Sequence, residues 1–381
     1  EKHVPRGRAN SLRLALTGQL GPDALTSEDM HETLSLCVGC KACQKECPMS
    51  VDITRMKTEF LHHYHSRHGL ALRERFIAWL PRYAKWMSKF PLIANLGSGK
   101  GLLAKLGEIF IGVTSHRENP QWRSDTFQNQ QPTTNNPENP EVVLWVDTFN
   151  TYFEPENAHA AIKILEAAGY SVNLPVFETR PVCCGRTFLN AGLIEEARAE
   201  ARRLAEVLGP WAEKGIPIIG LEPSCLLTLR DELTVIFPGS ASEAIKKEAV
   251  LLDEFLVSEK QKGKLQLDLQ PLDAKKALVH THCHQKALSN GGTTEEILTW
   301  IPKLEVESIK SGCCGMAGAF GYESEHYQTS LEMANLDLLP AVRAASPDTL
   351  IVAGGTSCRH QIDHGTDHEA VSFLQVLEKS L

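Results

Sequence analysis

The chain has 381 residues, of which 42% are hydrophobic and 23% charged, as is usual for a globular protein of two or three domains. Its formal net charge of −8 excludes the basic footprint of a nucleic-acid-binding protein. No apolar run reaches about 18 residues and no signal peptide is visible, so we expect a cytoplasmic protein without a membrane-spanning helix.

Residues 1–70 are predicted to form a helical domain around a tight group of cysteines. The segment CVGCKACQKECP has the spacing C-x2-C-x2-C-x3-C-P, in which one loop presents several sulfurs to one face of an iron–sulfur cluster. A structural zinc site would instead need paired C-x2-C knuckles with a longer spacer. We therefore predict a ferredoxin-type domain that binds a 4Fe–4S cluster through Cys37, Cys40, Cys43 and Cys47.

The cysteine before the proline has a separate role in this motif. In two-cluster ferredoxins that cysteine ligates the other cluster, so Cys47 is expected to serve a second cube. The remaining ligands must then lie on another motif, and residues 1–36 contain no cysteine. Because the chain begins at Glu1 rather than at methionine, we expect it to be a piece of a longer polypeptide.

Residues 71–140 are predicted to be a helical segment followed by a linker. Between residues 71 and 110 there are seven basic and two acidic residues, interleaved with aromatic side chains. This pattern suits contact with a membrane surface or a quinone, and it equally suits an amphipathic cap on the protein itself. The stretch 116–140 is polar with four prolines and is predicted to be the linker.

The rest of the chain is an internal repeat of two predicted βαβ domains, residues 141–260 and 270–381. Strands alternate with helices in both copies, which predicts an α/β fold with parallel sheets. Near-constant offsets indicate duplication: 135 residues from Thr148 to Cys283, 130 from Cys183 to Cys313, and 133 from Cys225 to Cys358.

The cysteines of each copy follow predicted strand ends, where sites form in parallel sheets. The second copy has a full set that is predicted to bind a metal or cluster: Cys283, Cys313, Cys314 and Cys358. The first copy has only Cys183, Cys184 and Cys225, with Thr148 at the fourth position. The first set is either a site that needs a foreign ligand or a relic whose thiols merely pack.

Three further residues are candidates for a catalytic or anion-binding role. His282 and His284 alternate with His280 along a predicted strand, so the three are expected to share a face. Arg186 directly follows the cysteine pair of the first copy and could stabilise a reduced cluster or an anion. Structural hydrogen bonds are the alternative for each histidine, and surface ion pairing is the alternative for the arginine.

One ferredoxin-type motif followed by two CCG repeats resembles the iron–sulfur subunits of glycolate oxidase and anaerobic glycerol-3-phosphate dehydrogenase, and the CCG-type subunit of heterodisulfide reductase. The segments RPVCCGRTFLNAGL, GLEPSCLLTLRDEL, THCHQKAL, GCCGMAGAFGYE and GTSCRHQI are more closely similar to the C-terminal half of fused FAD-linked D-2-hydroxyacid dehydrogenases. That group includes D-2-hydroxyglutarate and D-lactate dehydrogenases. Thr148, and lone cysteines in place of C-x2-C, depart from the pattern of the separate subunits.

This resemblance implies an iron–sulfur electron-transfer module of a larger FAD enzyme that oxidises a 2-hydroxy acid. The FAD and a first cluster motif would lie upstream in the same polypeptide, and the acceptor would be a quinone or an electron-transfer flavoprotein. The chain carries no flavin fingerprint, so it is not expected to oxidise the acid alone. Peripheral attachment to the inner membrane is a further expectation. The alternatives are a heterodisulfide or thiol reductase that acts through its CCG cysteines, and a structural or sensing protein that binds zinc or a cluster.

Overall fold

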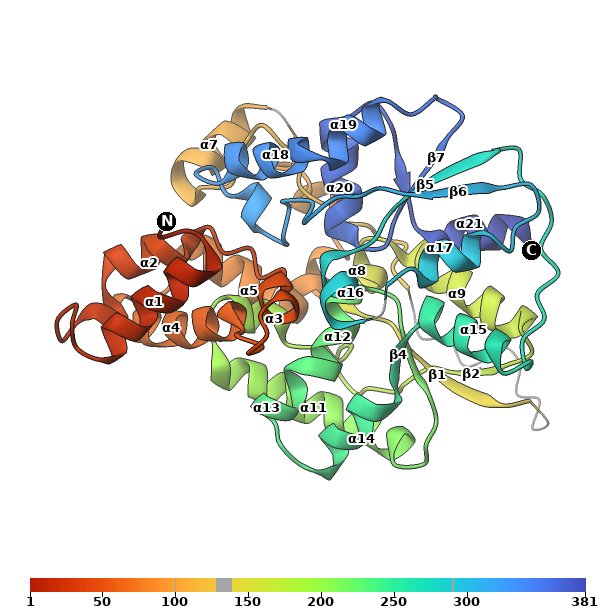
Figure 1. Cartoon of the computed structure of the whole chain (residues 1–381), viewed down its shortest axis with the longest axis horizontal. Coiled ribbons are helices and arrows are strands. Elements are labelled where there is room, and N and C mark those ends of the chain that lie inside the picture. Colours follow the sequence, from red (N-terminus) through yellow and green to blue (C-terminus); the bar gives the residue numbers. More distant parts are fainter. Residues whose placement is uncertain (100, 128–138, 290) are drawn as a thin grey trace.

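The computed structural model describes residues 1–99, 101–127, 139–289 and 291–381. Figure 1 places the helices of the first 70 residues at one end of the molecule and two α/β units at the other. The helices that precede the first sheet are α1 (Pro5–Leu16), η1 (Ala24–Thr26), α2 (Glu28–Ser35), α3 (Ala42–Glu46), α4 (Ile53–His68), α5 (Leu72–Met87), α6 (Pro91–Ala94) and α7 (Leu102–Ile111). No helix in the described ranges is both long and apolar enough to cross a membrane.

The first α/β unit is built on a parallel sheet with the strand order β2-β1-β3-β4. Its strands are β1 (Glu141–Trp145), β2 (Ser171–Asn173), β3 (Ile218–Gly220) and β4 (Ala249–Leu251). Its helices are α8 (Thr148–Tyr152), α9 (Pro155–Ala167), α10 (Arg186–Asn190), α11 (Ile194–Ala212), α12 (Pro223–Asp231), α13 (Leu233–Ile236), α14 (Ser240–Glu248) and α15 (Leu252–Gln261). Four consecutive residues of β1 are buried because helices cover both faces of a parallel sheet.

The second unit repeats this arrangement with the strand order β6-β5-β7-β8. Its strands are β5 (Lys276–His280), β6 (Glu305–Ser308), β7 (Leu350–Ala353) and β8 (Ala370–Val371). Its helices are α16 (Cys283–Leu288), α17 (Thr293–Leu298), η2 (Phe320–Tyr322), α18 (Tyr327–Leu336), α19 (Leu338–Arg343), α20 (Thr356–Gly365) and α21 (Phe373–Ser380). The same strand order in both sheets confirms the predicted α/β class and the duplication.

The two units pack against each other through equivalent helices. Helix α9 of the first unit contacts α21 of the second, and α17 of the second contacts α15 of the first. Exchanging the two copies turns one contact into the other, so the interface has the self-complementary form of a two-fold dimer. One apolar core includes Ile164, Leu256, Leu298 and Leu377 from these four helices. This shared core fixes the two strand-end sites relative to each other.

The predicted linker is wrong for its first part. Residues 112–127, here called the strap, pack on the protein, and Arg117 and Phe127 are buried. The strap pairs with the second unit, where Thr114 donates its N–H to the Tyr322 carbonyl at 2.8 Å. Backbone pairing of this kind has no signature in a polar, proline-rich sequence. Residues 128–138 of the predicted linker lie outside the described residues.

Candidate metal centres

The loop of residues 37–47, here called the cluster loop, holds three cysteines close together. Gly39 and Lys41 adopt left-handed backbone conformations, with φ of 64° and 63°, which wrap the chain tightly before α3. Burial, helped by thiolates that include Cys37 and Cys43, raises the pKa of Cys40 to about 11. Backbone N–H groups point at the sulfurs, as with Ala42 toward Cys40. Hydrogen bonds to sulfur of this kind tune iron–sulfur sites.

Cys47 lies in a different environment. Its pKa is lowered, chiefly by the N–H of Val51 and further by those of Met49 and Ser50, and the other loop thiols do not contribute to the shift. Successive N–H groups directed at one atom form an anion-binding nest that favours a thiolate. The arrangement agrees with the predicted division of three ligands for one cube and one for another, which stays a prediction.

A buried lysine anchors the cluster loop to the first unit. Lys41 has no exposed side-chain surface, and its Nζ lies 2.7 Å from Asp52, 2.6 Å from Asp231 and 2.9 Å from Glu232. Asp52 caps α4, next to the loop, whereas Asp231 and Glu232 end α12. The charges therefore join the cluster loop to a helix about 190 residues away in the sequence.

The cluster loop also contacts the second unit. The Nε2 atom of His284 lies 2.9 Å from the Gly39 carbonyl oxygen and 3.1 Å from Nη2 of Arg186. Helix α3 packs against α16, and Figure 1 shows both beside α12 at the centre of the molecule. A thiolate at Cys283 raises the pKa of Cys40, so the two sulfurs are electrostatic neighbours. The predicted cluster motif and the second CCG repeat thus meet at one place.

The four cysteines of the second unit converge and form what we call the second thiol set. Cys283 begins α16, Cys358 lies in the first turn of α20, and Cys313 and Cys314 follow β6. Their sulfurs form a chain of hydrogen-bond contacts from Cys283 to Cys313, Cys314 and Cys358. Contact with a neighbouring thiol, followed by burial, raises the pKa of Cys283 well above that of a free thiol. Neutral thiols this close together would become thiolates when they bind a metal.

The first thiol set, Cys183, Cys184 and Cys225, also converges. Each of the three is 4% exposed and belongs to the apolar core of the first unit. Cys184 contacts both of the others through sulfur hydrogen bonds. Thr148, at the position equivalent to Cys283, is buried at the start of α8. The duplication has therefore kept the geometry of the site with one sulfur fewer.

The two thiol sets differ in the charges around them. Near the first set, a hydrogen bond with Cys184 lowers the pKa of Cys225, but burial and then carboxylates at Asp147 and Glu222 raise it to about 12. Arg186, the cation that faces this set, is already paired with Glu232 at 3.1 Å. Carboxylates oppose the formation of thiolates, so this environment favours protonated cysteines in the first set.

Near the second set, the Glu222 carboxylate also helps to raise the pKa of Cys358, but a lysine is added to the surroundings. Burial lowers the pKa of Lys286, and thiolates at Cys358, Cys283 and Cys313 would oppose that shift. The Nζ of Lys286 donates to the Ser311 carbonyl at 2.7 Å. A cation close to several thiols stabilises a thiolate-bound, negatively charged centre, so the second set is the better metal site.

The spacing of the sulfurs argues against a single zinc ion. Tetrahedral zinc with bonds of about 2.3 Å holds its sulfurs about 4 Å apart. Among the described residues, no three cysteine sulfurs lie within 4.8 Å of one another. Neighbouring thiols of each set are in contact, but the sets do not form a ready tetrahedral site for one ion.

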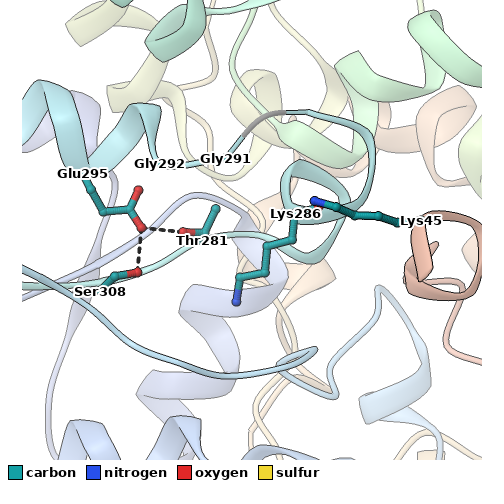
Figure 2. Close-up of a pocket in the computed structure, with 7 residues that line it drawn as sticks. All are labelled: Lys45, Thr281, Lys286, Gly291, Gly292, Glu295 and Ser308. Atoms are coloured by element: carbon teal, nitrogen blue, oxygen red, sulfur yellow. Dashed lines mark hydrogen bonds between the residues drawn. The ribbon is translucent and has the colours of Figure 1, made fainter.

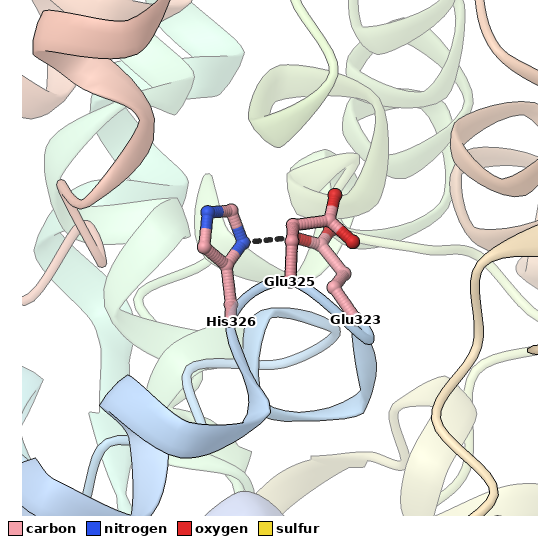
Figure 3. Close-up of side chains that lie close together, drawn as sticks. All are labelled: Glu323, Glu325 and His326. Carbon is pink, nitrogen blue, oxygen red and sulfur yellow. Dashed lines mark hydrogen bonds and ion pairs between the residues drawn. The ribbon is translucent and has the colours of Figure 1, made fainter.

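Another group does place three possible ligand atoms within 4.8 Å of one another. It consists of Glu323, Glu325 and His326, drawn in Figure 3. His326 pairs with Glu323 at 2.5 Å, and Arg73 binds Glu325 at 2.6 Å. Both carboxylates therefore have partners already. We assign this group a structural role, joining α5 to the segment before α18.

The predicted shared face of the three histidines is wrong. His280 ends β5, whereas His282 caps α16 and accepts the N–H of His284 at its Nδ1 atom. The strand ends earlier than expected because the chain turns into a helix at the edge of the sheet. Burial lowers the pKa of His282 to about 3 and that of His284 well below its usual value, so both are neutral near pH 7. Their contacts, and that of Arg186 to His284, favour positioning over the predicted catalytic role.

A pocket of about 480 Å³ opens beside the contact between the cluster loop and α16. Figure 2 shows its lining residues, Lys45, Thr281, Lys286, Gly291, Gly292, Glu295 and Ser308. Glu295 accepts hydrogen bonds from Thr281 at 2.7 Å and Ser308 at 2.8 Å. No cysteine is among the described residues that line this pocket.

Comparison with known proteins gives a match to both repeats. Residues 146–230 and 277–363 match the family described as a cysteine-rich domain, CCG. D-2-hydroxyglutarate dehydrogenase of Escherichia coli (strain K12) is 25% identical over 371 residues, which cover 92% of this chain and 35% of that protein. The chain therefore spans about a third of that relative.

Two homologues are closer to this chain in length. One subunit of the anaerobic glycerol-3-phosphate dehydrogenase of Escherichia coli (strain K12) is 29% identical over 245 residues, 63% of this chain and 59% of that protein. A probable glycolate oxidase iron-sulfur subunit of Bacillus subtilis (strain 168) is 23% identical over 393 residues, covering 98% of this chain and 85% of that protein. The homologues are dehydrogenases and iron–sulfur subunits, which supports an oxidoreductase role in electron transfer.

Proposed function

We propose, on the premise that the chain carries two CCG cysteine-rich domains and is homologous to dehydrogenases and iron–sulfur subunits, that it is the iron–sulfur module of an FAD-linked D-2-hydroxyacid dehydrogenase. Cys37, Cys40 and Cys43 would hold one 4Fe–4S cluster, and Cys47 would complete a second. The second thiol set would hold a further centre. Clusters at these residues supply one-electron chemistry, and the protein positions them and tunes their potentials.

The observation that carries this proposal is the contact between the cluster loop and the second unit. His284 is bonded to the Gly39 carbonyl, and Cys40 and Cys283 are electrostatic neighbours. Two thiolate sites placed side by side are what a chain of electron carriers requires. A thiol reductase would need only one of them, together with an opening to its sulfurs. The flavin domain and the first cluster motif would lie upstream in the same polypeptide, and the acceptor would be a quinone or a flavoprotein.

Metal analysis tests the proposal. Anaerobic reconstitution of the full polypeptide with ferrous iron and sulfide is expected to give iron and acid-labile sulfide in similar amounts. Reduction by a D-2-hydroxy acid should then produce the EPR signals of reduced clusters. Zinc without acid-labile sulfide would instead identify a structural or sensing protein.

The predicted membrane contact gains support from the helices before the strap. Neither α6 nor α7 contains a buried residue, and Leu92, Ile109 and Phe110 are 87%, 75% and 79% exposed. Figure 1 shows α7 at the outer edge of the molecule. The nearby exposed cations Lys85, Lys89 and Lys105 complement anionic headgroups. We propose that this face lies on an anionic lipid surface, where a membrane quinone is within reach.

Vesicle binding tests this part of the proposal. Ile109→Glu is expected to weaken sedimentation with phosphatidylglycerol vesicles at least about tenfold, because burying an isoleucine contributes roughly 2 kcal/mol and a carboxylate is repelled. Val176→Glu changes an equally exposed residue elsewhere and should leave binding unchanged. Equal binding of the wild type to phosphatidylcholine, or an equal loss in both variants, would contradict a specific anionic-lipid face.

A further inference from the structure

Arg117 brings a positive charge from the strap into the protein interior. Its side chain is 2% exposed. Nη1 donates to the Gln361 side-chain oxygen and to the Met316 sulfur, the latter at 3.1 Å. Nε and Nη2 have no hydrogen-bond partner among the described residues. Two of the three nitrogens of the guanidinium are thus buried and unpaired, which is costly for any charged group.

No described carboxylate balances this charge. Burial lowers the pKa of Arg117, and the acidic groups that oppose the shift are the Tyr322 and Tyr327 phenols and the Cys314 thiol. The guanidinium carbon lies 5.8 Å from the Tyr322 ring and 5.3 Å from the Tyr327 ring. The attraction between a cation and neutral aromatic rings is weak compared with the hydration free energy that the guanidinium loses on burial. The remaining acidic neighbour is a ligand candidate of the second thiol set.

The other buried cations discussed for this region each have a carboxylate partner. Arg359 lies beside Cys358, but it also binds Glu154, with Nε 3.0 Å from the carboxylate. Arg186 binds Glu232, and Lys41 binds three carboxylates. Among these four cations, Arg117 alone has no carboxylate partner in the described part of the chain. Of its acidic neighbours, Cys314 becomes charged when a metal turns it into a thiolate.

We infer that Arg117 is the counter-charge of an anionic iron–sulfur centre in the second thiol set, and that it sets the potential of that centre. The inference rests on the proposed function. A thiolate-ligated cluster carries net negative charge, which grows by one unit on reduction, and a nearby buried cation favours the reduced form. The backbone pairing of the strap with residues 322–324 holds Arg117 against Met316, two residues after Cys314.

An EPR-monitored redox titration tests the inference on the reconstituted full polypeptide. Arg117→Gln is expected to lower the midpoint potential of the centre by at least about 59 mV, which corresponds to a tenfold change in the one-electron equilibrium constant. Arg117→Lys should restore most of the shift, since it keeps the charge. Arg123→Gln is the matched control, because Arg123 lies in the same strap and already binds Asp125 and Glu156.

Stability without iron gives a second readout. Arg117→Met is expected to raise the melting temperature of the iron-free protein, because it removes an unbalanced buried charge, and to lower iron uptake at the second set. An unchanged potential in Arg117→Gln, with the centre present, would overturn the inference and leave the proposed function intact. If the wild-type protein loads no iron at these cysteines, the proposed centre fails first.

Discussion

Lys41→Met is expected to lower the free energy of unfolding by about 3–5 kcal/mol, the cost of removing one partner from a buried charge group. Three carboxylates surround the Lys41 ammonium group, which has no exposed surface. Arg55 still contacts Asp231 and Arg186 still contacts Glu232, so the remaining charge is partly but not fully compensated. The midpoint of urea-induced unfolding measures the effect if both proteins unfold with the same slope.

Lys45 supplies the matched control for this prediction. It lies in the same loop but is exposed, and it donates one hydrogen bond to the Lys286 carbonyl. Lys45→Met should therefore cost about 1 kcal/mol or less. Adding Asp231→Asn to Lys41→Met should recover part of the stability, because it removes one of the unpaired charges. If both lysine variants unfold at the same midpoint, the buried charge group does not anchor the loop.

The repeat architecture could be predicted from the sequence because it depends on local patterns. Strand and helix periods alternate in both copies, and the cysteine landmarks recur at nearly equal offsets from Cys183 to Cys313 and from Cys225 to Cys358. Parallel sheets place such residues at strand ends, so convergence of each thiol set followed from topology alone. The prediction that the three histidines share a strand face was wrong, because packing rather than sequence alternation decides the change from strand to helix after His280.

The residues that the sequence did not reveal are those defined by distant contacts. Lys41 is an ordinary lysine between two cysteines until α12 brings Asp231 and Glu232 to it. Arg117 lies in a polar segment that predicts a linker, and its burial depends on pairing with residues 322–324. The neighbouring positions of Cys40 and Cys283 depend on how the helical part docks on both units. Local sequence propensities do not encode such contacts between segments that are far apart in the chain.

Cys313→Ser is expected to remove iron from the second thiol set and to slow electron delivery to an acceptor at least about 100-fold, since even weaker changes around metal ligands cost 10–100-fold. Serine keeps the size of the side chain but loses the soft thiolate that iron–sulfur clusters need. Iron, acid-labile sulfide and the EPR spectrum of each reconstituted full-length variant would be measured beside the rate of acceptor reduction.

Cys183→Ser is the internal control that the duplication provides, because it alters the equivalent cysteine of the first copy. The first set has one sulfur fewer and faces the Asp147 carboxylate. The Cys183→Ser variant should therefore match the wild type in iron content and electron transfer. Equal iron loss in both variants would show that both sets bind clusters. Full iron in Cys313→Ser, with a lost disulfide-reductase activity, would favour catalysis by the thiols themselves. Iron loss confined to Cys313→Ser is the outcome that agrees with a cluster in the second thiol set and none in the first. The cations Arg117 and Lys286 distinguish the surroundings of the second set.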